Sequence, residues 1–264
     1  MRVWAIANQK GGVGKTTTTV SIAGLLEEQG HQVLVIDLDP HGSLTSYFGF
    51  DPDAISNSVF KLFQTNDPIY GDDVMALVSK TTAPNIDIIP SSPALATVER
   101  QMTGKDGMGL RMNKAIDAIS GAYDFVLLDC PPVLGVLMIN ALAACEHLLI
   151  PVQTEFLALK GLERMTRTLQ MVQKARPKPL PFTIIPTMYD RRTHASMSSL
   201  NTLRKQYPEQ LWRSMIPVDT RLRDASRRGI VPSACDPDGR GVRAYKQLLN
   251  QLLQQSAETA QLTA

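Results

Sequence analysis

The fold of this chain is decided by the stretch Asn8-Gln9-Lys10-Gly11-Gly12-Val13-Gly14-Lys15-Thr16-Thr17. It joins a strand-like run at residues 2–7 to a helix-like run at residues 17–29. A glycine-rich turn in this setting directs successive backbone N–H groups, and the positive end of the following helix, toward a bound anion. Lys15 can neutralise the β- and γ-phosphate oxygens of a nucleotide, and the Thr16 hydroxyl can bind Mg²⁺. The stretch therefore predicts a phosphate-binding loop.

Two positions of this loop differ from the general pattern G-x-x-x-x-G-K-[ST]. Gln9 stands where the pattern has its first glycine, and Lys10 adds a second lysine inside the loop. Ordinary turns also contain short glycine patterns, but this one lies between a strand and a helix, which is the context that nucleotide binding requires. The residues expected to bind the nucleotide phosphates are Gly11, Gly12, Val13, Gly14, Lys15, Thr16 and Thr17.

Composition and charge exclude several classes of protein. The 264 residues are 44% hydrophobic and 20% charged, which suits a folded chain with a substantial core, and the net charge of +2 does not by itself indicate a nucleic-acid binder. The three cysteines lie far apart and form no C-x-x-C pair, which argues against a disulfide framework, a zinc site or an iron–sulfur cluster. The sequence has no signal-peptide pattern and no apolar run of ~18 residues. We therefore expect a cytoplasmic protein without membrane insertion.

Strand-like and helix-like segments alternate along most of the chain. This pattern predicts a doubly wound α/β fold, with a mostly parallel sheet and helices on both faces. The strands are expected at residues 3–7, 33–37, 86–90, 125–129, 147–152, 182–186 and 211–216. The helices are expected at residues 17–29, 110–120, 161–174, 196–207 and 240–255. We expect a single domain over residues 1–264, with an excursion at the edge of the sheet at residues 51–84 and a frayed tail at residues 256–264.

Three aspartates follow predicted strands, at the edge where ligands of such sheets bind. Asp129 precedes two prolines that cannot continue a strand ladder, and it is expected to hold Mg²⁺ through a coordinated water. Asp37 is expected to organise the water shell of the same ion. Asp39, two residues further on, is placed to orient or deprotonate an attacking water. An aspartate before a proline is also a common turn residue, so a structural role for Asp39 stays open.

Three motifs resemble the deviant Walker A, switch I and switch II motifs of the ParA/MinD-type ATPases. They are Lys10-Gly11-Gly12-Val13-Gly14-Lys15-Thr16-Thr17, Asp37-Leu38-Asp39-Pro40 and Asp129-Cys130-Pro131-Pro132. The resemblance extends over nearly the whole chain, with later blocks at residues 151–156, 187–193 and 240–245. It implies a P-loop ATPase that uses ATP and Mg²⁺ and forms a homodimer with ATP between the two subunits.

The resemblance also implies roles for single residues. Lys10 would reach the phosphates of the partner subunit, which agrees with the extra positive charge that two facing triphosphates need. Asp39 would position the hydrolytic water. The adenine would lie beside residues 187–189 and 216–219, so Met188, Pro217 and Val218 are expected to contact it. Two departures from the family pattern, His41 in place of Gln and Val133 in place of a polar residue, remove no catalytic group.

Residues 217–229 resemble a block that the family uses for non-specific contact with DNA. Val218 stands where relatives often have arginine, and positive charge is supplied further along the block. Phosphate contacts need only basic side chains on a common face and carry no sequence readout. The candidate DNA-binding residues are Arg221, Arg223, Arg227 and Arg228. The alternative is a solvated basic face whose positive charge is balanced by Asp219 and Asp224.

As a whole, the resemblance implies an ATP-dependent dimerisation switch with slow hydrolysis that positions intracellular cargo. Residues 39–43 and 218–224 are similar to ParA-like proteins of the ParC type, which implies polar chemosensory arrays as the cargo and a ParP-like adaptor. Chromosome or plasmid partitioning with a ParB-like partner is the alternative. The protein would then lie on the nucleoid or at the cell pole.

Two other classes of function remain to be weighed. A metabolic P-loop enzyme, such as an amide ligase or a nitrogenase-type reductase, would need substrate or cluster ligands, and the cysteine spacing disfavours the cluster. A scaffold with a vestigial nucleotide site is disfavoured by the complete set Lys15, Thr16, Asp37, Asp39 and Asp129.

The segment 242–253 has apolar residues at helical spacing, but glutamines dominate its polar face, so core packing is favoured over membrane binding.

Overall fold

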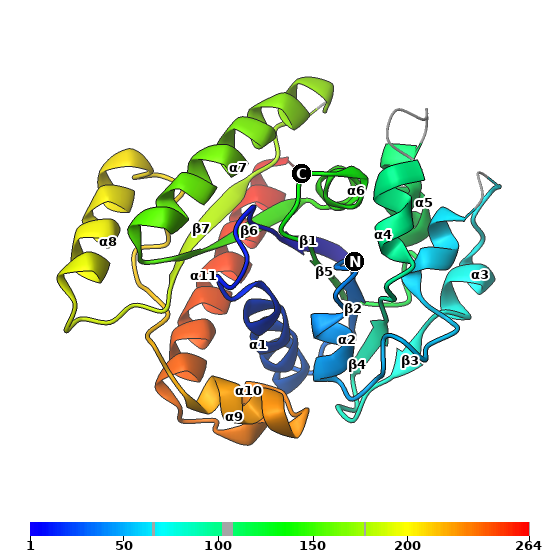
Figure 1. Cartoon of the computed structure of the whole chain (residues 1–264), viewed down its shortest axis with the longest axis horizontal. Helices are drawn as coiled ribbons and strands as arrows, with labels where there is room; N and C mark the ends of the chain where they lie inside the picture. Colours follow the sequence, from blue (N-terminus) through cyan, green and yellow to red (C-terminus); the bar gives the residue numbers. More distant parts are fainter. Residues whose placement is uncertain (65–66, 102–107, 177, 264) are drawn as a thin grey trace.

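A twisted, mostly parallel sheet forms the centre of the computed structural model, which describes residues 1–64, 67–101, 108–176 and 178–263 (Figure 1). In these residues the sheet has seven strands in the order β3-β4-β2-β5-β1-β6-β7. The strands are β1 (Arg2–Ile6), β2 (Val33–Asp37), β3 (Ser79–Lys80), β4 (Ile86–Ile89), β5 (Phe125–Asp129), β6 (His147–Gln153) and β7 (Phe182–Thr187). All neighbouring pairs are parallel except β3 and β4, which are antiparallel. The predicted doubly wound α/β fold is confirmed.

Helices cover both faces of this sheet. The α-helices are α1 (Lys15–Glu28), α2 (Ser43–Tyr47), α3 (Gly71–Met75), α4 (Leu95–Gln101), α5 (Arg111–Ala118), α6 (Val136–Ala144), α7 (Phe156–Ala175), α8 (His194–Gln206), α9 (Arg221–Arg228), α10 (Pro232–Cys235) and α11 (Arg240–Thr263). Two short 3₁₀ helices, η1 (Val59–Phe63) and η2 (Met108–Leu110), complete the elements. No helix of the described residues combines the length and the apolar character that crossing a bilayer requires.

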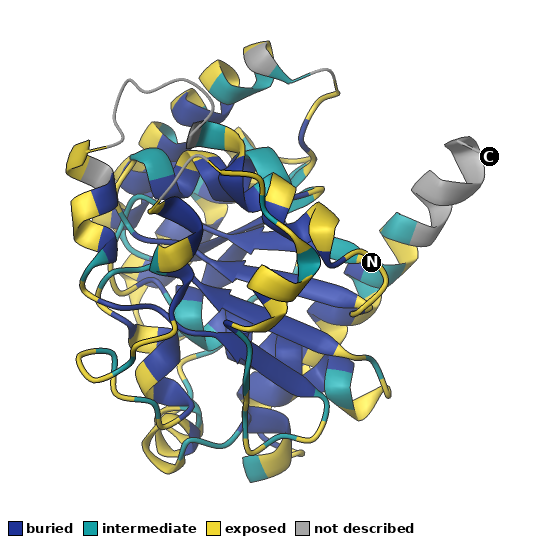
Figure 2. Cartoon of the chain, turned by 90° about the vertical axis from the view of Figure 1, so that its right-hand side faces the viewer, coloured by how far each residue is buried: buried dark blue, intermediate teal, exposed yellow. Residues whose placement is uncertain are grey.

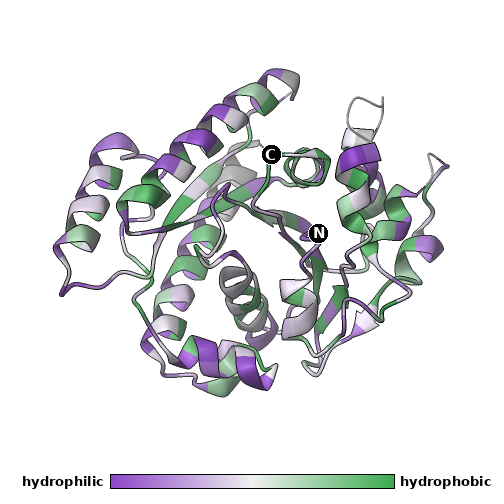
Figure 3. Ribbon diagram, in the orientation of Figure 1, coloured by the Kyte–Doolittle hydropathy of each residue, from purple (hydrophilic) through white to green (hydrophobic). Residues whose placement is uncertain are grey.

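The hydrophobic core forms two clusters, one on each face of the sheet. Along β1, Trp4 and Ile6 belong to one cluster together with α1 and α11, and Val3 and Ala5 belong to the other together with α5, α6 and α7. This division follows from the strand period of two residues. Figure 2 shows the strands as the buried centre, and Figure 3 shows hydrophilic residues on the outer faces of the helices, most densely on α9.

The continuous apolar runs explain why the central strands could be predicted well. All five residues of β2 and of β5 are buried, and both strands have their predicted bounds. Such runs are typical of strands that helices cover on both faces. The excursion at residues 51–84 contains η1, α3 and β3, and β3 forms the edge of the sheet, as predicted.

The prediction of a strand at residues 211–216 is wrong. Leu211 forms an isolated bridge with Ile184, and the Trp212 amide donates to the Ile184 carbonyl at 2.9 Å. The chain then bends at residues 213–214, so it runs beside β7 without forming a continuous ladder.

Helix α11 continues through residues 256–263, where we expected a frayed tail, and residue 264 lies outside the described residues.

Candidate functional site

The glycine-rich loop lies between the end of β1 and the start of α1. Gly12 has φ +75° and Gly14 has φ +92°, a left-handed conformation that side chains rarely allow. Helix α1 begins at Lys15, and no side chain caps its first turn. Among the described residues no side chain accepts from the backbone N–H groups of that turn, and these groups, with the helix dipole, favour an anion there.

Hydrogen bonds to three neighbouring elements hold this loop. The Asn8 side-chain amide donates to the Pro151 carbonyl of β6 at 2.7 Å, and the Gln9 amide donates to Thr168 Oγ1 of α7 at 2.6 Å. The Thr187 hydroxyl of β7 donates to the Val13 carbonyl at 2.8 Å. Gln9, which departs from the general pattern, thus anchors the loop to α7.

The inner end of the loop contacts the acid at the end of β5. The Thr16 hydroxyl donates to Asp129 Oδ2 at 2.7 Å, and the Thr19 hydroxyl lies 3.4 Å from Asp129 Oδ1. Lys15 is buried, and its Nζ lies 3.5 Å from the Lys10 carbonyl oxygen. The predicted phosphate lysine, hydroxyl and metal-side acid therefore lie together.

One acid, Asp37, ends β2, and a second, Asp39, follows two residues later. Asp37 pairs in register with Asp129, and its Oδ2 accepts from the Thr45 amide at 2.8 Å and the Thr45 hydroxyl at 2.7 Å. Asp39 Oδ1 accepts from the His41 amide at 3.0 Å and lies 2.8 Å from His41 Nδ1. The Asp37 side chain is thereby fixed within the subunit, whereas the Asp39 side chain is held by an exposed histidine.

Burial controls the protonation of these acids. Desolvation, together with the neighbouring Asp37 carboxylate, raises the pKa of Asp129 to about 8 against the opposing effects of Thr16 and Lys15. Desolvation also raises the pKa of Asp37 to about 6, although hydrogen bonds from Thr45 oppose the shift. Two buried carboxylates side by side need positive charge, and together with the Thr16 hydroxyl they form a set of oxygen donors that suits Mg²⁺ with water and phosphate as further ligands.

Two pockets adjoin at the loop. The first has a volume of ≈ 370 Å³ and is lined by the glycine-rich loop together with Asp39, Ser43 and Pro132. The second has a volume of ≈ 360 Å³, and the predicted adenine contacts Met188, Pro217 and Val218 all line it. The two pockets share the lining residues Gly14, Thr17, Met188 and Ser226, and we treat them as two sides of one site. One side of the combined site suits phosphates and the other suits a flat base.

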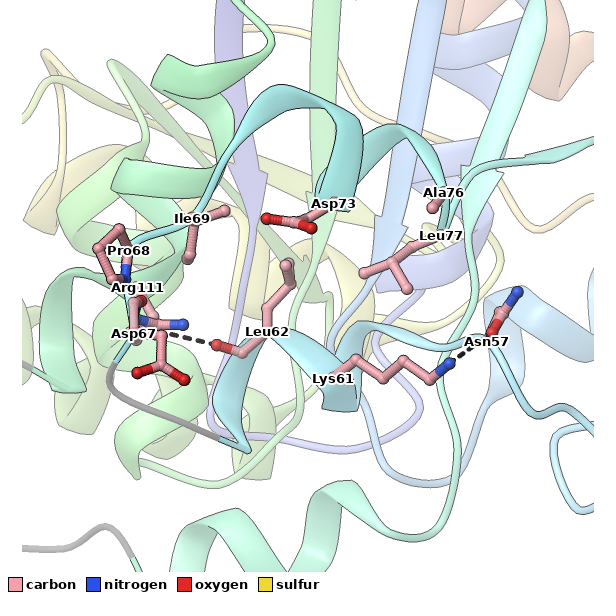
Figure 4. A pocket seen from close by; sticks show the side chains of 10 residues that line it. All are labelled: Asn57, Lys61, Leu62, Asp67, Pro68, Ile69, Asp73, Ala76, Leu77 and Arg111. Atoms are coloured by element: carbon pink, nitrogen blue, oxygen red, sulfur yellow. Dashed lines mark hydrogen bonds between the residues drawn. The ribbon is translucent and has the colours of Figure 1, made fainter.

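A separate cavity of ≈ 410 Å³ lies between η1, α3 and α5, away from the loop (Figure 4). No residue of the glycine-rich loop lines it. Its buried Arg111 donates to the Leu62 carbonyl at 2.8 Å and to the Asp67 carbonyl at 2.7 Å, and burial lowers the pKa of the guanidinium. Arg111 therefore ties the edge excursion to α5.

The Lys10 ammonium has a partner of its own, although the Lys10 carbonyl lies beside Lys15. The Lys10 Nζ is 3.5 Å from Glu155 Oε1, and both side chains are partly exposed. Two exposed apolar residues, Phe156 and Leu157, follow Glu155 at the start of α7, and two more, Val133 and Leu134, follow the paired prolines after β5. The loop thus has a buried inner lysine and an outer lysine on a partly apolar surface.

The four candidate DNA-binding arginines lie on α9 but differ in their contacts. Arg221 forms an ion pair with Asp236 at 2.7 Å, and Arg228 Nη1 lies 3.3 Å from the Cys235 sulfur. Arg223 and Arg227 are exposed, lie one helical turn apart and form no ion pair within the described residues. Arg223 also lines the base side of the site.

Some residues that line the site were not predicted from the sequence. Gln153 ends β6 at the ligand-binding edge of the sheet, and its position after a predicted strand was an available signal. Ser226 lines both pockets from α9, a helix that was not predicted. Tyr245 lines the base side, and its hydroxyl lies 2.9 Å from Thr18 Oγ1, a pairing across 227 residues that no local pattern indicates.

Comparisons with known proteins show the family of this chain. The family model described as an AAA domain matches residues 1–181. The chain is 34% identical to the sporulation initiation inhibitor protein Soj of Bacillus subtilis, over 95% of this chain and 98% of that protein. It is 31% identical to the chromosome partitioning protein ParA of Myxococcus xanthus, over 96% of this chain and 88% of that protein.

Solved structures share the fold. The crystal structure of cobyrinic acid a,c-diamide synthase from Mycobacterium smegmatis with bound ADP and magnesium is 33% identical, with a TM-score of 0.80 over 96% of this chain and 94% of that one. The structure of an ATP complex of a Cyanothece McdA variant is 23% identical, with a TM-score of 0.82 over 95% of this chain and 96% of that one, and at this identity it supports the fold alone. The chain belongs to the ParA/MinD-type family of P-loop ATPases, among the ParA/Soj-like partitioning ATPases.

Proposed function

We propose that this protein is an ATP-dependent dimerisation switch that hydrolyses ATP slowly and positions intracellular cargo. The observation that carries the proposal is the division of the loop into two parts. Lys15, Thr16 and the acids Asp37 and Asp129 lie together within one subunit, whereas the Lys10 side chain pairs with Glu155 and is partly exposed. A nucleotide switch needs both parts, one for binding and one for sensing a partner.

ATP and Mg²⁺ fit the combined site. The N–H groups of the loop and Lys15 would hold the phosphates, and Met188, Pro217 and Val218 would border the adenine. Thr16, Asp37 and Asp129 would hold Mg²⁺, the last two through its water shell. When bound, Mg²⁺ neutralises charge on the β- and γ-phosphate oxygens.

Asp39 is proposed to orient or deprotonate the attacking water. It lines the phosphate side of the site, and its carboxylate has only the exposed His41 as a side-chain hydrogen-bond partner among the described residues. A carboxylate with this freedom can accept a proton from water, in contrast to Asp37, which three donors hold. Slow turnover suits a switch because its task is timed release.

Lys10 is proposed to contact the phosphates of the partner subunit in a homodimer. Its ion pair with Glu155 is partly exposed, so exchanging that partner for a phosphate costs little free energy. The exposed side chains of Phe156, Leu157, Val133 and Leu134 supply apolar surface for a partner to cover. These features support an interface on this side of the molecule.

The homodimer is tested by measuring molar mass with light scattering in the presence of ATP and of ADP. The parent protein should form a dimer with ATP, and Lys10→Ala should remain a monomer while still binding nucleotide. Lys160→Ala is the matched control, because Lys160 is an exposed lysine of α7 that pairs with Glu163. A dimer of unchanged mass and stability in Lys10→Ala would remove the proposed role of Lys10.

Non-specific DNA is the proposed ligand of α9, chiefly through Arg223 and Arg227, with Arg221 and Arg228 as additional contacts. The first two have no ion-pair partner among the described residues, so phosphate contact breaks no internal bond. The double variant Arg223→Ala/Arg227→Ala should weaken DNA binding and lower the slope of log affinity against log salt by about 2. If the parent protein binds no DNA with ATP, the surface serves a protein partner instead.

For the cargo we propose polar chemosensory arrays, reached through a ParP-like adaptor, on the resemblance of residues 39–43 and 218–224 to ParC-type proteins. Chromosome or plasmid partitioning with a ParB-like adaptor is the alternative, and the similarity to Soj and ParA favours it. The protein would lie in the cytoplasm, on the nucleoid or at the cell pole. A fluorescent fusion that follows chemoreceptor arrays supports the first proposal, and one that follows ParB foci supports the second.

A metabolic amide ligase is a second candidate because the similar structure from Mycobacterium smegmatis is a diamide synthase. The two functions differ in what phosphate release requires. A switch releases phosphate from ATP without a small-molecule cosubstrate, whereas a ligase needs its acid and an amine donor. Phosphate release by the purified protein with ATP and Mg²⁺ alone therefore separates them.

A further inference from the structure

Helix α2 connects the acids of the phosphate side to a distant part of the chain. Its Thr45 holds Asp37 through two hydrogen bonds, and the amide of Gly42 just before the helix donates to the Asp39 carbonyl at 2.9 Å. Its last residue, Tyr47, is buried, and the Tyr47 hydroxyl donates to the Ile230 carbonyl at 2.8 Å. The helix is therefore tied to the Asp37 carboxylate by Thr45, to the Asp39 backbone by the residue before it, and to the segment after α9 by its last residue.

The segment that receives this hydrogen bond is the turn that ends α9. Gly229 caps α9 with φ +65°, and a Cβ at this position would lie 3.1 Å from the Tyr47 carbonyl oxygen. Helix α10 follows at once and packs on α1, where a Cβ on Gly24 would lie only 2.7 Å from Val231. The turn is thus held between α2 on one side and α1 on the other.

Both α2 and α9 line the phosphate side of the site. Ser43 and Tyr47 of α2 and Ser226 of α9 line the same pocket as the glycine-rich loop. A group that fills this pocket and presses on α2 must change the position of Tyr47 relative to the end of α9, because α2 is too short and too firmly tied to Asp37 to absorb the change.

We propose that Tyr47 is a positioning residue that makes the orientation of the arginine helix α9 depend on the nucleotide in the phosphate pocket. The hydrogen bond from its hydroxyl to the Ile230 carbonyl carries the coupling. This inference rests on the proposed function, since α9 bears the arginines proposed to bind DNA. It adds the route by which ATP and ADP would give that surface two different states.

The test compares the parent protein with Tyr47→Phe, which keeps the ring and removes only the hydroxyl. Affinity for a short labelled duplex of random sequence is measured at saturating ATP and at saturating ADP, with saturation set for each variant by its own nucleotide titration. Hydrogen exchange of residues 221–235 is measured under the same two conditions. We expect the ratio of the two DNA affinities to fall at least about five-fold in Tyr47→Phe. The difference in exchange between ATP and ADP should disappear.

Tyr123→Phe is the matched control, because Tyr123 donates its hydroxyl to Asp87 Oδ2 at 2.9 Å and lines neither pocket of the site. It should keep the parent ratio. The exchange measurement is repeated in Lys10→Ala, so that protection by a partner subunit is not mistaken for coupling.

Four outcomes are distinguishable. The inference is overturned if Tyr47→Phe keeps both the ratio of DNA affinities and the exchange difference of the parent. It is also overturned if α9 of the parent protein exchanges equally with ATP and with ADP. A parent protein that binds no DNA, but whose exchange difference disappears in Tyr47→Phe, contradicts the proposed DNA binding and supports the coupling. A lower ratio in Tyr47→Phe but not in Tyr123→Phe supports both.

Discussion

Lys15 and Lys10 belong to one loop but lie in different surroundings. Lys15 is buried beside Thr16 and Asp129, and the Thr16–Asp129 hydrogen bond of 2.7 Å closes the inner network within the subunit. The Lys10 Nζ lies 3.5 Å from Glu155 Oε1, and both side chains are partly exposed. Buried polar groups must find partners within the fold, whereas an exposed ion pair contributes only about 0–1 kcal/mol and can be exchanged. The inner network is therefore suited to binding and the outer lysine to assembly.

The largest expected effect concerns Asp39, which is part of neither the buried network of Lys15 nor the ion pair of Lys10. Asp39→Ala should lower ATP hydrolysis by about 100- to 10,000-fold because a positioned general base is lost. The ATP-dependent dimer should persist, since binding and assembly use other residues. Single-turnover phosphate release and light scattering measure the two effects, with the exposed Asp53→Ala as the control. Undiminished hydrolysis would remove Asp39 from the chemistry.

The second-largest expected effect tests the difference between Lys15 and Lys10 directly. Lys15→Ala should weaken binding of a fluorescent ATP analogue by about 100-fold, because charge-assisted hydrogen bonds to the phosphates are lost. Lys10→Ala, measured in dilute solution where the protein is monomeric, should bind the analogue nearly as well as the parent. Equal losses in the two variants would mean that the two parts of the loop do not differ in function.

The buried acids predict a dependence of stability on pH. The pKa of Asp129 is raised from 3.8 to about 8, so the folded protein without ligand keeps a proton that the unfolded chain releases. The stability that this proton gives is present at low pH and is lost as the pH rises toward 8. Relative to Asp129→Asn, the parent should lose at least about 1 kcal/mol, or roughly 3 °C in Tm, between about pH 5 and about pH 8.

Thermal unfolding without nucleotide measures this effect, and the variant supplies the reference because its amide does not titrate. Parallel curves for the two proteins would show that Asp129 is ionised throughout. Addition of Mg²⁺ and ATP should reduce the loss, since a bound cation stabilises the ionised carboxylate.

The smallest effect concerns the outer lysine. Glu155→Gln removes the ion-pair partner of Lys10 in the protein without ATP. Half-maximal dimerisation should therefore need about two- to five-fold less ATP, a small change because an exposed ion pair contributes little free energy. Glu163→Gln is the control, because Glu163 pairs with Lys160 on the same helix. A higher ATP requirement in Glu155→Gln would mean that Glu155 holds Lys10 in the orientation that the dimer needs.

The central strands and the inner site could be predicted from the sequence because their signals are local. Phe125–Asp129 is a continuous apolar run that ends in an acid, and the loop has its lysine and threonine at fixed spacing. Helix α6 was missed because its residues are almost all apolar, so the helical period has no polar face to reveal it. Helix α9 was missed for the opposite reason, since its sequence is almost entirely polar and only Ala225 is buried.

Contacts between distant segments could not be predicted. Tyr47 and Ile230 are 183 residues apart, and no local pattern indicates that one hydroxyl joins them. Thr168, the partner of Gln9 on α7, is 159 residues away in the sequence. These pairings depend on the packing of helices against the finished sheet, which a single sequence leaves open.

The anchoring of the loop by Asn8, Gln9 and Thr187 has a consequence for binding kinetics. The loop has its shape before any nucleotide arrives, because β6, α7 and β7 hold it. The conformational entropy of the loop is then lost during folding, and association need not wait for a slow ordering step. The observed rate of nucleotide association should therefore rise linearly with concentration, and slow kinetic phases should report subunit assembly or hydrolysis.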